Sequence, residues 1–486
     1  MAKEKIKIGT EGIYDARKLG VGKMVVLGFQ HMFAMFGATV LVPILTGLSV
    51  STTLLFAGLG TLLFHCLTKF KVPAFLGSSF AFLGGYAAVT RLPDGTLQKD
   101  MLPYACLGVA CAGALYLVLA LVIKIVGIHK VMKLFPPVVT GPIIIAIGLG
   151  LAPSAINNCK TNWWIALIAL ALVIIFNIFG KGMIKIIPIL LGIIGAVAVA
   201  AILAVTLGDT VVVDKVEYIA INGSEKMLLF STGALENLKE ASWIGNPIDW
   251  QSTVFGGVSD GSKAVSAIIA IVPIAIATMM EHIGDISAIS ATCGKNYIDD
   301  PGLHRTLLGD GLATSLASLF GAPANTTYGE NTGVLALSKV YDPRVIRIAA
   351  CFAIVFSLSP KFAACINLMP TAVIGGISFV LYGMISAIGV RNVVEAKVDF
   401  SKARNTIVAA VILVLSLGLT DGITFTIGSA TITLTALAVA SIAGILLNVI
   451  FPEKDFNFEN AFESVEDSAQ INLKSDYGKK EKRNNT

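Results

Sequence analysis

The sequence predicts an all-α membrane protein, because three of its properties fit a chain that crosses a lipid bilayer many times. Hydrophobic residues make up 55% of the 486 residues and charged residues only 14%, against roughly 25% charged residues in a soluble domain. The apolar residues gather in runs of about 17–25 residues, the length of a membrane-spanning helix. Lysine and arginine gather in alternate loops between these runs, as they do on the cytoplasmic side of membrane proteins.

Fourteen apolar runs are long enough to be predicted as transmembrane segments. The third and the tenth are interrupted by glycine and proline. In chain order the segments cover residues 24–47, 52–68, 73–90, 103–126, 137–152, 163–179, 184–207, 264–282, 306–320, 323–339, 346–369, 371–390, 404–420 and 432–451.

The basic loops predict the orientation of the chain. Six lysines and arginines precede the first segment, and others lie in alternate loops, such as Arg344 with Arg347. By the positive-inside rule both termini are cytoplasmic. Loop 208–263 is then extracellular, and the weak alternation of residues 211–221 predicts a small hairpin there. Residues 452–486 mix charges with asparagine and serine, which predicts a disordered cytoplasmic tail.

Several functional classes are excluded by what the sequence lacks. No Ser/His/Asp set, Walker loop or zinc-ligand spacing is present, and the seven cysteines show no metal-binding spacing. The sequence therefore predicts neither an enzyme nor a metal site. The net charge of +5 follows from the basic loops, so we expect no nucleic-acid partner.

The two halves of the sequence resemble each other at their interrupted segments. Fourteen segments divide into seven plus seven, and an odd number inverts the second half, which predicts two inverted repeats. Residues 73–80 and 323–328 each contain a proline followed by two hydroxyl residues and an aromatic. Broken segments at corresponding places point to a transporter's substrate site. We therefore expect short extended breaks in segments three and ten, each followed by a half-helix, with substrate bound between them.

Three carboxylates lie in or beside apolar segments, where a charge is costly and usually functional. Glu330 follows Gly329, whose missing side chain lets the backbone approach a ligand; a capping or packing carboxylate is the alternative. Glu281 and Asp285 share one face if the helix continues, with Cβ atoms about 5–6 Å apart. Carboxylates that close tend to hold a proton between them. In the alternative, both lie in a solvated cytoplasmic loop, residues 283–305.

Other residues of interest also have structural alternatives. Phe80 and Tyr328 lie at the two breaks, where a ring could stack on a flat heterocycle, although a single aromatic in a membrane segment is more often packing. His31 is either a structural hydrogen-bonding group or a support for the site. Asp310 is either functional or solvated at the cytoplasmic rim, and Asn331 either contacts the site or holds the broken backbone.

Several long motifs, in this order, resemble those of the uracil permeases in the nucleobase-ascorbate transporter family. The resemblance extends from about residue 20 to residue 452. The motifs are QHMFAMFGATVLVP at 30–43, GSSFAF at 77–82, EHIGD at 281–285, DPGLHR at 300–305 and NTTYGENTG at 325–333.

The resemblance implies a division into a core domain and a gate domain. The core would comprise residues 24–126 (segments 1–4) and 264–369 (segments 8–11), and the gate residues 127–207 and 370–451. Residues 1–23 would form a cytoplasmic N-terminus. The resemblance also implies a multi-pass protein of the bacterial cytoplasmic membrane, surrounded by lipid, that imports uracil together with protons, requires no cofactor beyond the coupling proton, and often forms a homodimer.

The resemblance also implies roles for individual residues. Glu281 and Glu330 would pair with the N–H and carbonyl edge of the base, Phe80 would stack on it, and the backbone at Ala38 and Gly329 would complete the pocket. Tyr328 would lie beside these contacts. Our hypothesis is that Glu281 and Asp285 carry the coupling proton, with His31, Asp310 and Asn331 as supporting residues.

The residues leave the substrate open between two related classes. Asp285 stands where uracil permeases usually carry histidine, and it resembles the purine-transporting branch, as does Asp310. Glu330 stands where that branch tends to carry glutamine, so it favours uracil. Xanthine or another purine is therefore the alternative substrate. More remote alternatives are an anion exchanger, which should carry a cation in place of Glu330, and a channel, which would need a continuous polar stripe.

Overall fold

The structure is a computed structural model that describes residues 8–9, 11–92, 96–127, 130–131, 133–419, 422–427 and 430–452. The side chains of residues 183, 186, 330, 427 and 430–433 lie outside the described part. The tail predicted to be disordered also lies outside it, except for residue 452.

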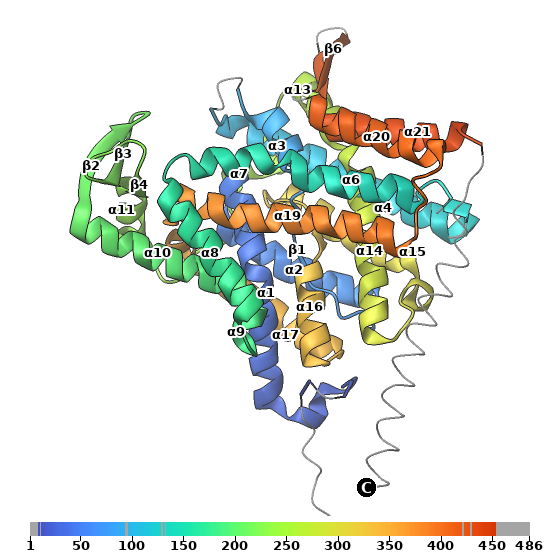
Figure 1. Cartoon of the computed structure of the whole chain (residues 1–486), viewed down its shortest axis with the longest axis horizontal. Coiled ribbons are helices and arrows are strands. Elements are labelled where there is room, and N and C mark those ends of the chain that lie inside the picture. The colour runs from blue at the N-terminus through green and yellow to red at the C-terminus, as the bar shows by residue number, and fades with distance from the viewer. Residues whose placement is uncertain are drawn as a thin grey trace, which may run out of the picture.

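Helices fill most of the described chain (Figure 1). Those of the first half are α1 (Val21–Thr46), α2 (Val50–Leu67), α3 (Leu83–Thr90), α4 (Leu102–Val126), α6 (Pro137–Gly150), α7 (Ala152–Cys159), α8 (Trp163–Phe179), α9 (Met183–Ile186) and α10 (Pro188–Leu207). Those of the second half are α11 (Thr232–Glu240), α12 (Val254–Gly257), α13 (Gly261–Ile271), α14 (Ile274–Cys293), α15 (Leu303–Leu319), α16 (Gly329–Ser338), α17 (Pro343–Ser357), α18 (Pro360–Asn367), α19 (Thr371–Glu395), α20 (Ala403–Gly418) and α21 (Ala436–Ile450).

Local sequence explains where many of these helices begin. An Asx or Ser side chain before the first turn accepts a hydrogen bond from an otherwise unpaired backbone N–H group. Asn162 does this for α8, Asp260 for α13 and Ser359 for α18. Proline occupies the first turn of α17 after the cap Asp342, where its missing N–H group costs nothing.

The helices are those of a multi-pass membrane protein. By length and composition, six helical stretches in the described residues could cross a bilayer, or eight if two bent pairs are each one span. The bends are 41° between α13 and α14 and 88° between α17 and α18. Pro273 lies at the first bend and Pro360 at the second, and each removes a backbone donor. Every predicted segment contains helix, but fourteen crossings and inverted repeats remain predictions.

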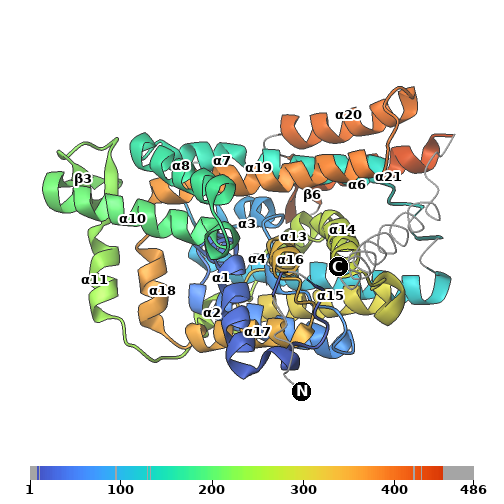
Figure 2. The same ribbon diagram turned by 60° about the horizontal axis from the view of Figure 1, so that its bottom comes forward.

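The helices pack in two groups. Figure 2 shows α6, α7, α8, α19, α20 and α21 along one side of the molecule and α1, α2, α15 and α17 on the other. Helix α19 packs on α6, α7 and α8, and α20 packs on α6 and α21, whereas α15 packs on α4 and α2, and α17 on α1 and α2. Helix α14 contacts members of both groups, namely α4 and α15 in one and α6 and α21 in the other. It therefore lies where the two groups meet.

The predicted breaks in segments three and ten are present, and they pair with each other. Strand β1 (Leu76–Ser78) and strand β5 (Asn325–Thr327) form a two-stranded antiparallel sheet, with Gly77 opposite Thr326. Each strand is followed by a short helix, α3 or α16. Backbone groups of a broken segment must be satisfied within the protein, since lipid offers no hydrogen bonds. Each break supplies the partners that the other needs.

The hairpin predicted at residues 211–221 is present and is longer than expected. Strand β2 (Gly208–Val213) pairs with β3 (Val216–Ile221), and β3 also pairs with β4 (Leu228–Ser231). Short helical turns complete the chain at Ala16–Leu19, Lys99–Met101, Trp250–Ser252 and Ile298–Gly302.

Three predicted segment limits were wrong by four residues or more. The twelfth segment was expected to end at 390, but α19 continues to Glu395. The eighth segment was expected to end at 282, but α14 continues to Cys293, because its polar residues pack inside the protein and do not end the helix. The fourteenth was expected to begin at 432, but β6 (Ile423–Ile427) and β7 (Ala430–Leu434) form a hairpin before α21 begins at Ala436. Alternating threonine and apolar residues there fit a strand, and residues 432–435 had been counted as apolar helix.

Two glycines on α6 allow a test of helix packing. A Cβ at Gly148 would lie 2.3 Å from the carbonyl oxygen of Tyr382 on α19, whereas a Cβ at Gly150 would meet no atom within 4 Å. We expect Gly148→Ala to lower stability by about 1–3 kcal/mol through overpacking, and Gly150→Ala to raise it by up to about 1 kcal/mol through helix propensity. Melting temperatures of the purified variants would measure both; equal shifts would show that α6 and α19 do not pack this closely.

Candidate functional site

The paired breaks are held in place from α1 and α2. Thr61 on α2 uses its hydroxyl both to accept from the backbone N–H of Leu76 (2.9 Å) and to donate to the carbonyl oxygen of that residue (3.2 Å). The sheet continues at its ends through Tyr328 N to Phe75 O (3.1 Å) and Ser79 N to Ala324 O (2.8 Å). The breaks are thus a fixed platform between α1, α2 and α14.

Tyr328 connects the two breaks to α1. Its hydroxyl donates to the carbonyl oxygen of Ser78 (2.8 Å), and the hydroxyl of Thr39 donates to it (3.2 Å). A Cβ at Gly77 would lie 2.4 Å from its ring, so the ring covers the glycine closely. Tyr328 lies at the break, as predicted, and these contacts give it a structural part in joining the two halves.

Glu281 and Asp285 lie inside α14, so the alternative of a solvated loop at 283–305 is wrong for both. They are one helical turn apart, and Asp285 is buried. Helix α14 packs against α16. A Cβ at Gly329 would lie 3.7 Å from Oδ1 of Asp285, an ordinary contact that leaves the glycine's backbone beside the carboxylate. The structure therefore brings the two sequence motifs, 281–285 and 325–333, together.

A line of polar side chains runs from Asp285 into the protein. The hydroxyl of Thr327 donates to Oδ2 of Asp285 (3.2 Å) and lies 3.4 Å from Nδ1 of His282. Nδ1 of His282 lies 3.0 Å from Oδ2 of Asp310, and both side chains are fully buried. Asp310 is therefore not solvated at a cytoplasmic rim. The line joins α14, β5 and α15, and sequence reasoning missed His282 although it lies inside the motif that contains Glu281.

Glu330 belongs to the first turn of α16, which begins at Gly329. Its side chain lies outside the described part of the structure, so its predicted role remains a prediction. The backbone places the residue directly after the break and next to Gly329, at a helix N-terminus where a negative charge is stabilised.

Phe80 lies against the opposite group of helices. It follows β1, is largely buried, and its ring meets the ring of Tyr382 on α19 edge to face, with centroids 5.9 Å apart. Ser378 lies one turn before Tyr382 on the same helix, and the two hydroxyls are buried next to each other. Sequence reasoning missed this pair, since a tyrosine and a serine in an apolar segment are unremarkable until the fold places them opposite Phe80.

The remaining predicted residues support the platform. Nδ2 of Asn331 donates to the carbonyl oxygen of His31 (3.1 Å) and lies 3.3 Å from its Nδ1, so this contact ties α16 to α1. Ala38 is fully buried on α1, one position before Thr39, which contacts Tyr328.

Buried polar atoms without a hydrogen-bond partner gather around the breaks. In the described residues they include Ser79 Oγ, Thr326 Oγ1, Thr332 Oγ1, Asn331 Oδ1, His31 Nε2, His282 Nε2 and Asp310 Oδ1. Buried polar groups are normally hydrogen-bonded. The region therefore has unused capacity to bind a polar ligand or water, in contrast to the apolar surfaces of the surrounding helices.

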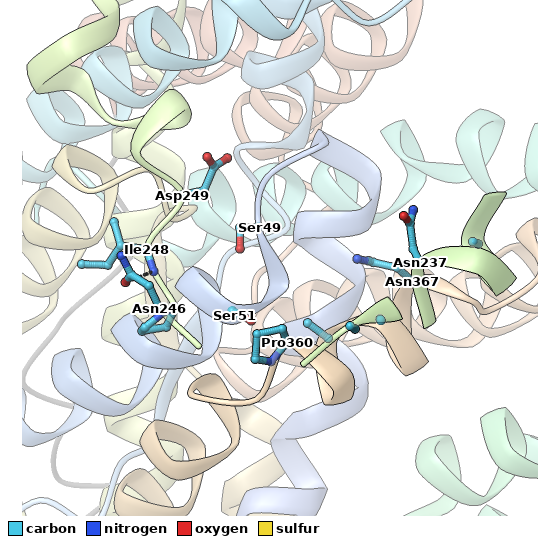
Figure 3. A pocket seen from close by; sticks show the side chains of 13 residues that line it. Ser49, Ser51, Asn237, Asn246, Ile248, Asp249, Pro360 and Asn367 are labelled. Carbon is cyan, nitrogen blue, oxygen red and sulfur yellow. Dashed lines mark hydrogen bonds between the residues drawn. The ribbon is translucent and has the colours of Figure 1, made fainter. Parts of the chain in front are cut away.

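A separate pocket of about 390 Å³ lies between α2, α11 and α18 (Figure 3). Asn237 and Asn367 lie side by side on one wall, and Asn246 accepts a hydrogen bond from the backbone of Ile248 (3.0 Å) on another. None of the predicted site residues lines it. Its walls come partly from residues 246–249 of the loop between α10 and α13, so it is separate from the breaks.

Sequence comparisons identify relatives over most of the chain. A model of the permease family matches residues 22–425. The uracil permease of Bacillus caldolyticus is 40% identical over 454 residues, which cover 91% of this chain and 95% of that protein. The uracil permease of Bacillus subtilis is 36% identical, with 93% of this chain and 97% of that protein covered, and that of Escherichia coli strain K12 is 36% identical, with 87% and 90% covered.

Solved structures with a similar fold come from anion transporters. The transmembrane domain of the cyanobacterial bicarbonate transporter BicA aligns with a TM-score of 0.59 at 15% identity, over 90% of this chain and 100% of that chain. The structure of SLC26A9 aligns with a TM-score of 0.58 at 12% identity, over 91% of this chain and 67% of that chain. At such low identity these likenesses show a shared transporter fold and carry no information on substrate.

Proposed function

The chain belongs to the permease family, as its motifs predicted, and on that premise we propose that it imports uracil across the bacterial cytoplasmic membrane by symport with protons. Relatives called uracil permeases match it over nearly their whole length. The observation that carries the proposal is the pairing of β1 with β5, because it places the motifs of both halves beside the carboxylates of α14.

The substrate is proposed to bind against the paired breaks. Glu281 and Glu330 accept hydrogen bonds from the ring N–H groups of the base, while backbone N–H groups near Ala38 and Gly329 donate to its carbonyls. Phe80 stacks on the ring. The proposal is supported by the close approach of Gly329 to Asp285 and by the unused polar capacity around the breaks. Tyr328, whose hydroxyl is engaged by Ser78 and Thr39, shapes the floor of this site.

The coupling proton is proposed to reside on Glu281 and Asp285. One helical turn separates them on α14, and two carboxylates so close in a weakly hydrated place cannot both ionise cheaply. Thr327 offers Asp285 a hydrogen bond and, with His282 and Asp310, extends the polar line away from the substrate.

Transport is proposed to proceed by movement of a core against a gate. The packing of the helices in two groups supports this proposal, and Phe80 with Tyr382 is a contact between the groups. An edge-to-face ring contact contributes about 0.5–1.5 kcal/mol, weak enough to be broken in each cycle. A homodimer and the cytoplasmic position of both termini are part of the same proposal.

Uptake of labelled uracil into proteoliposomes would test the function. Inward uptake should saturate and should increase when the outside is acidic; a channel would give no saturation. Unlabelled uracil should compete more strongly than xanthine, thymine or hypoxanthine. Xanthine is the second candidate substrate because Asp285 and Asp310 resemble the purine-transporting branch. If xanthine competed more strongly than uracil, the result would show that xanthine, and not uracil, is the preferred substrate.

Glu330 provides a sharper test of substrate choice. Glu330→Gln keeps the size of the side chain and removes its charge, so a charge-assisted hydrogen bond worth about 1.5–3 kcal/mol is lost, and uracil uptake should fall roughly 10- to 100-fold. Glu236→Gln, in the exposed helix α11, is the matched control and should transport normally. Full uptake by Glu330→Gln would remove the residue from the site, whereas new uptake of xanthine would identify it as the selectivity residue.

A further inference from the structure

A pocket of about 720 Å³ lies on the face where the N-terminal segment packs, and no residue of β1 or β5 lines it. We call it the basic pocket. Its volume falls within the roughly 300–1,000 Å³ typical of small-molecule sites. Four separate stretches of chain supply its lining, which consists of Tyr14, Phe70, Lys71, Lys295, Asn296, Tyr297, Asp300, Tyr341, Asp342, Pro343, Arg344 and Arg347.

The walls of the basic pocket are fixed by long-range contacts. Ile13 bridges to Val340 beside Tyr341, and the hydroxyl of Tyr14 donates to the carbonyl oxygen of Cys293 at the end of α14 (2.7 Å). The backbone N–H of Ala16 donates to Asp342 (2.8 Å). The N-terminal segment thus closes the pocket from one side, between the ends of α14 and α16 and the start of α17.

Both carboxylates of the lining are already neutralised. Asp300 forms an ion pair with Lys71, and Asp342 forms one with Arg344 at 3.0 Å. The hydrogen bond from Lys71, together with the charges of Lys69 and Lys295, lowers the pKa of Asp300 below its usual value. Asp300 therefore stays ionised near neutral pH and keeps Lys71 occupied.

Two cations of the lining, Lys295 and Arg347, form no close ion pair with a carboxylate within the described residues, although Asp300 and Asp342 lie near enough to interact with them electrostatically. Nζ of Lys295 lies over the ring of Tyr14, 4.6 Å from its centroid, and the guanidinium of Arg347 lies over the ring of Phe70 at 4.9 Å. A cation over an aromatic ring is held in position without losing its charge. The basic pocket therefore presents two net positive charges, and the Phe70 and Tyr14 side chains beside them are about half and two-fifths exposed (51% and 41%).

We propose that the basic pocket binds a nucleoside monophosphate, with the phosphate on Lys295 and Arg347 and the base against the exposed rings of Phe70 and Tyr14. A phosphate monoester carries about −1.5 to −2 charges at pH 7, which matches the two cations, and a guanidinium binds phosphate through two parallel hydrogen bonds. A phosphodiester lipid headgroup shares the phosphate but carries a single charge, and it has no flat ring.

The contacts that form the basic pocket are the same whichever substrate the protein transports. The loops that line the pocket are those predicted to be cytoplasmic from their lysines and arginines. A nucleotide bound there would contact the ends of α14, α16 and α17, the helices that follow or contain the candidate transport residues. The basic pocket thereby offers the cell a means of sensing nucleotide at the inner face of the transporter.

Isothermal titration calorimetry of the full chain in an uncharged detergent, with uridine 5′-monophosphate or adenosine 5′-monophosphate as the added ligand, would test the proposal. We expect saturable binding of the nucleotides and at least tenfold weaker binding of uridine, adenosine and inorganic phosphate, since each lacks one half of the recognised ligand. Equal binding of nucleosides and nucleotides would overturn the role of the cations, and equal binding of inorganic phosphate would overturn the role of the rings.

Variants would locate the binding. Arg347→Gln and Lys295→Gln should each weaken nucleotide binding at least tenfold, Arg347→Lys should weaken it less, and Lys124→Gln, an exposed lysine at the end of α4, should have no effect. Unaltered binding in both glutamine variants would refute the site. The melting temperature without ligand confirms that each variant is folded.

A second measurement distinguishes a bound lipid phosphate from a bound nucleotide phosphate. Native mass spectrometry from vesicles of phosphatidylglycerol or phosphatidylcholine would show whether an anionic lipid remains bound. Suppose that phosphatidylglycerol remains bound to the protein, is lost in Arg347→Gln and resists displacement by uridine 5′-monophosphate. That result would assign the pocket to lipid and overturn the nucleotide proposal. Displacement of the lipid by the nucleotide would support it.

Discussion

Replacing Asp285 with asparagine is expected to uncouple uracil uptake from the proton gradient while leaving exchange of uracil intact. The variant keeps the hydrogen-bonding side chain beside Thr327 but cannot share a proton with Glu281. For one proton per base, a difference of one pH unit stores about 1.4 kcal/mol and supports about tenfold accumulation. Accumulation in proteoliposomes should therefore fall from about tenfold to none.

Counterflow separates coupling from binding in this variant. Asp285→Asn proteoliposomes loaded with unlabelled uracil should still exchange it for labelled uracil. Asp299→Asn, which changes an exposed carboxylate in the turn after α14, should accumulate uracil normally. Unchanged accumulation by Asp285→Asn would remove the residue from the coupling mechanism, and loss of exchange as well would make it a binding residue instead.

Removing Asp310 is expected to destabilise the protein more than removal of any surface carboxylate. Asp310 and His282 are both fully buried at 3.0 Å, and breaking a buried pair by deleting one partner costs about 3–5 kcal/mol. Asp310→Ala should therefore lower the melting temperature in detergent by roughly 5–10 °C. The double variant His282→Ala and Asp310→Ala should be less affected than the sum of the two single variants.

A surface pair provides the contrast. Glu395 lies 3.5 Å from Arg391 on α19, and both side chains are largely exposed, so Glu395→Ala should cost less than about 1 kcal/mol. Additive effects at His282 and Asp310, or a shift for Asp310→Ala as small as that for Glu395→Ala, would show that the buried pair does not contribute as a unit.

The paired breaks illustrate what could be predicted from sequence. Prolines, glycines and hydroxyl residues at 73–80 and 323–328 stood out against apolar surroundings, so the position of each break was correct. Their mutual pairing, with Leu76 opposite Thr327, was not predicted as such. Each break leaves backbone groups that need partners, and only the fold shows that the partner of one break is the other.

The length of α14 illustrates what sequence reasoning cannot see. Glu281, His282 and Asp285 suggested the edge of a membrane segment, because charge usually marks the return to water. In the structure α14 continues for about two more turns beyond Asp285, to Cys293, and Thr327 and Asp310 satisfy the polar groups inside. Burial of this kind depends on partners that are distant in sequence.

Tyr382 and His31 illustrate the same limit for site residues. Nothing near Tyr382 in the sequence indicates that it meets Phe80, some 300 positions earlier. His31 was left between two roles, and its contacts with Asn331 give it a clear position on the platform. A polar residue in an apolar helix can be noticed from sequence, but its partner has to come from the fold.

The β1–β5 sheet also has a consequence for how the chain is made. Ser78 and Tyr328, which are hydrogen-bonded in the finished protein, are 250 positions apart. At a synthesis rate of about 5–20 residues per second, the backbone groups of β1 wait roughly 12–50 seconds for their partners. Bare backbone groups are not tolerated by lipid over that time. The first half must therefore remain shielded, by the insertion machinery or by a partly inserted state, until β5 is synthesised.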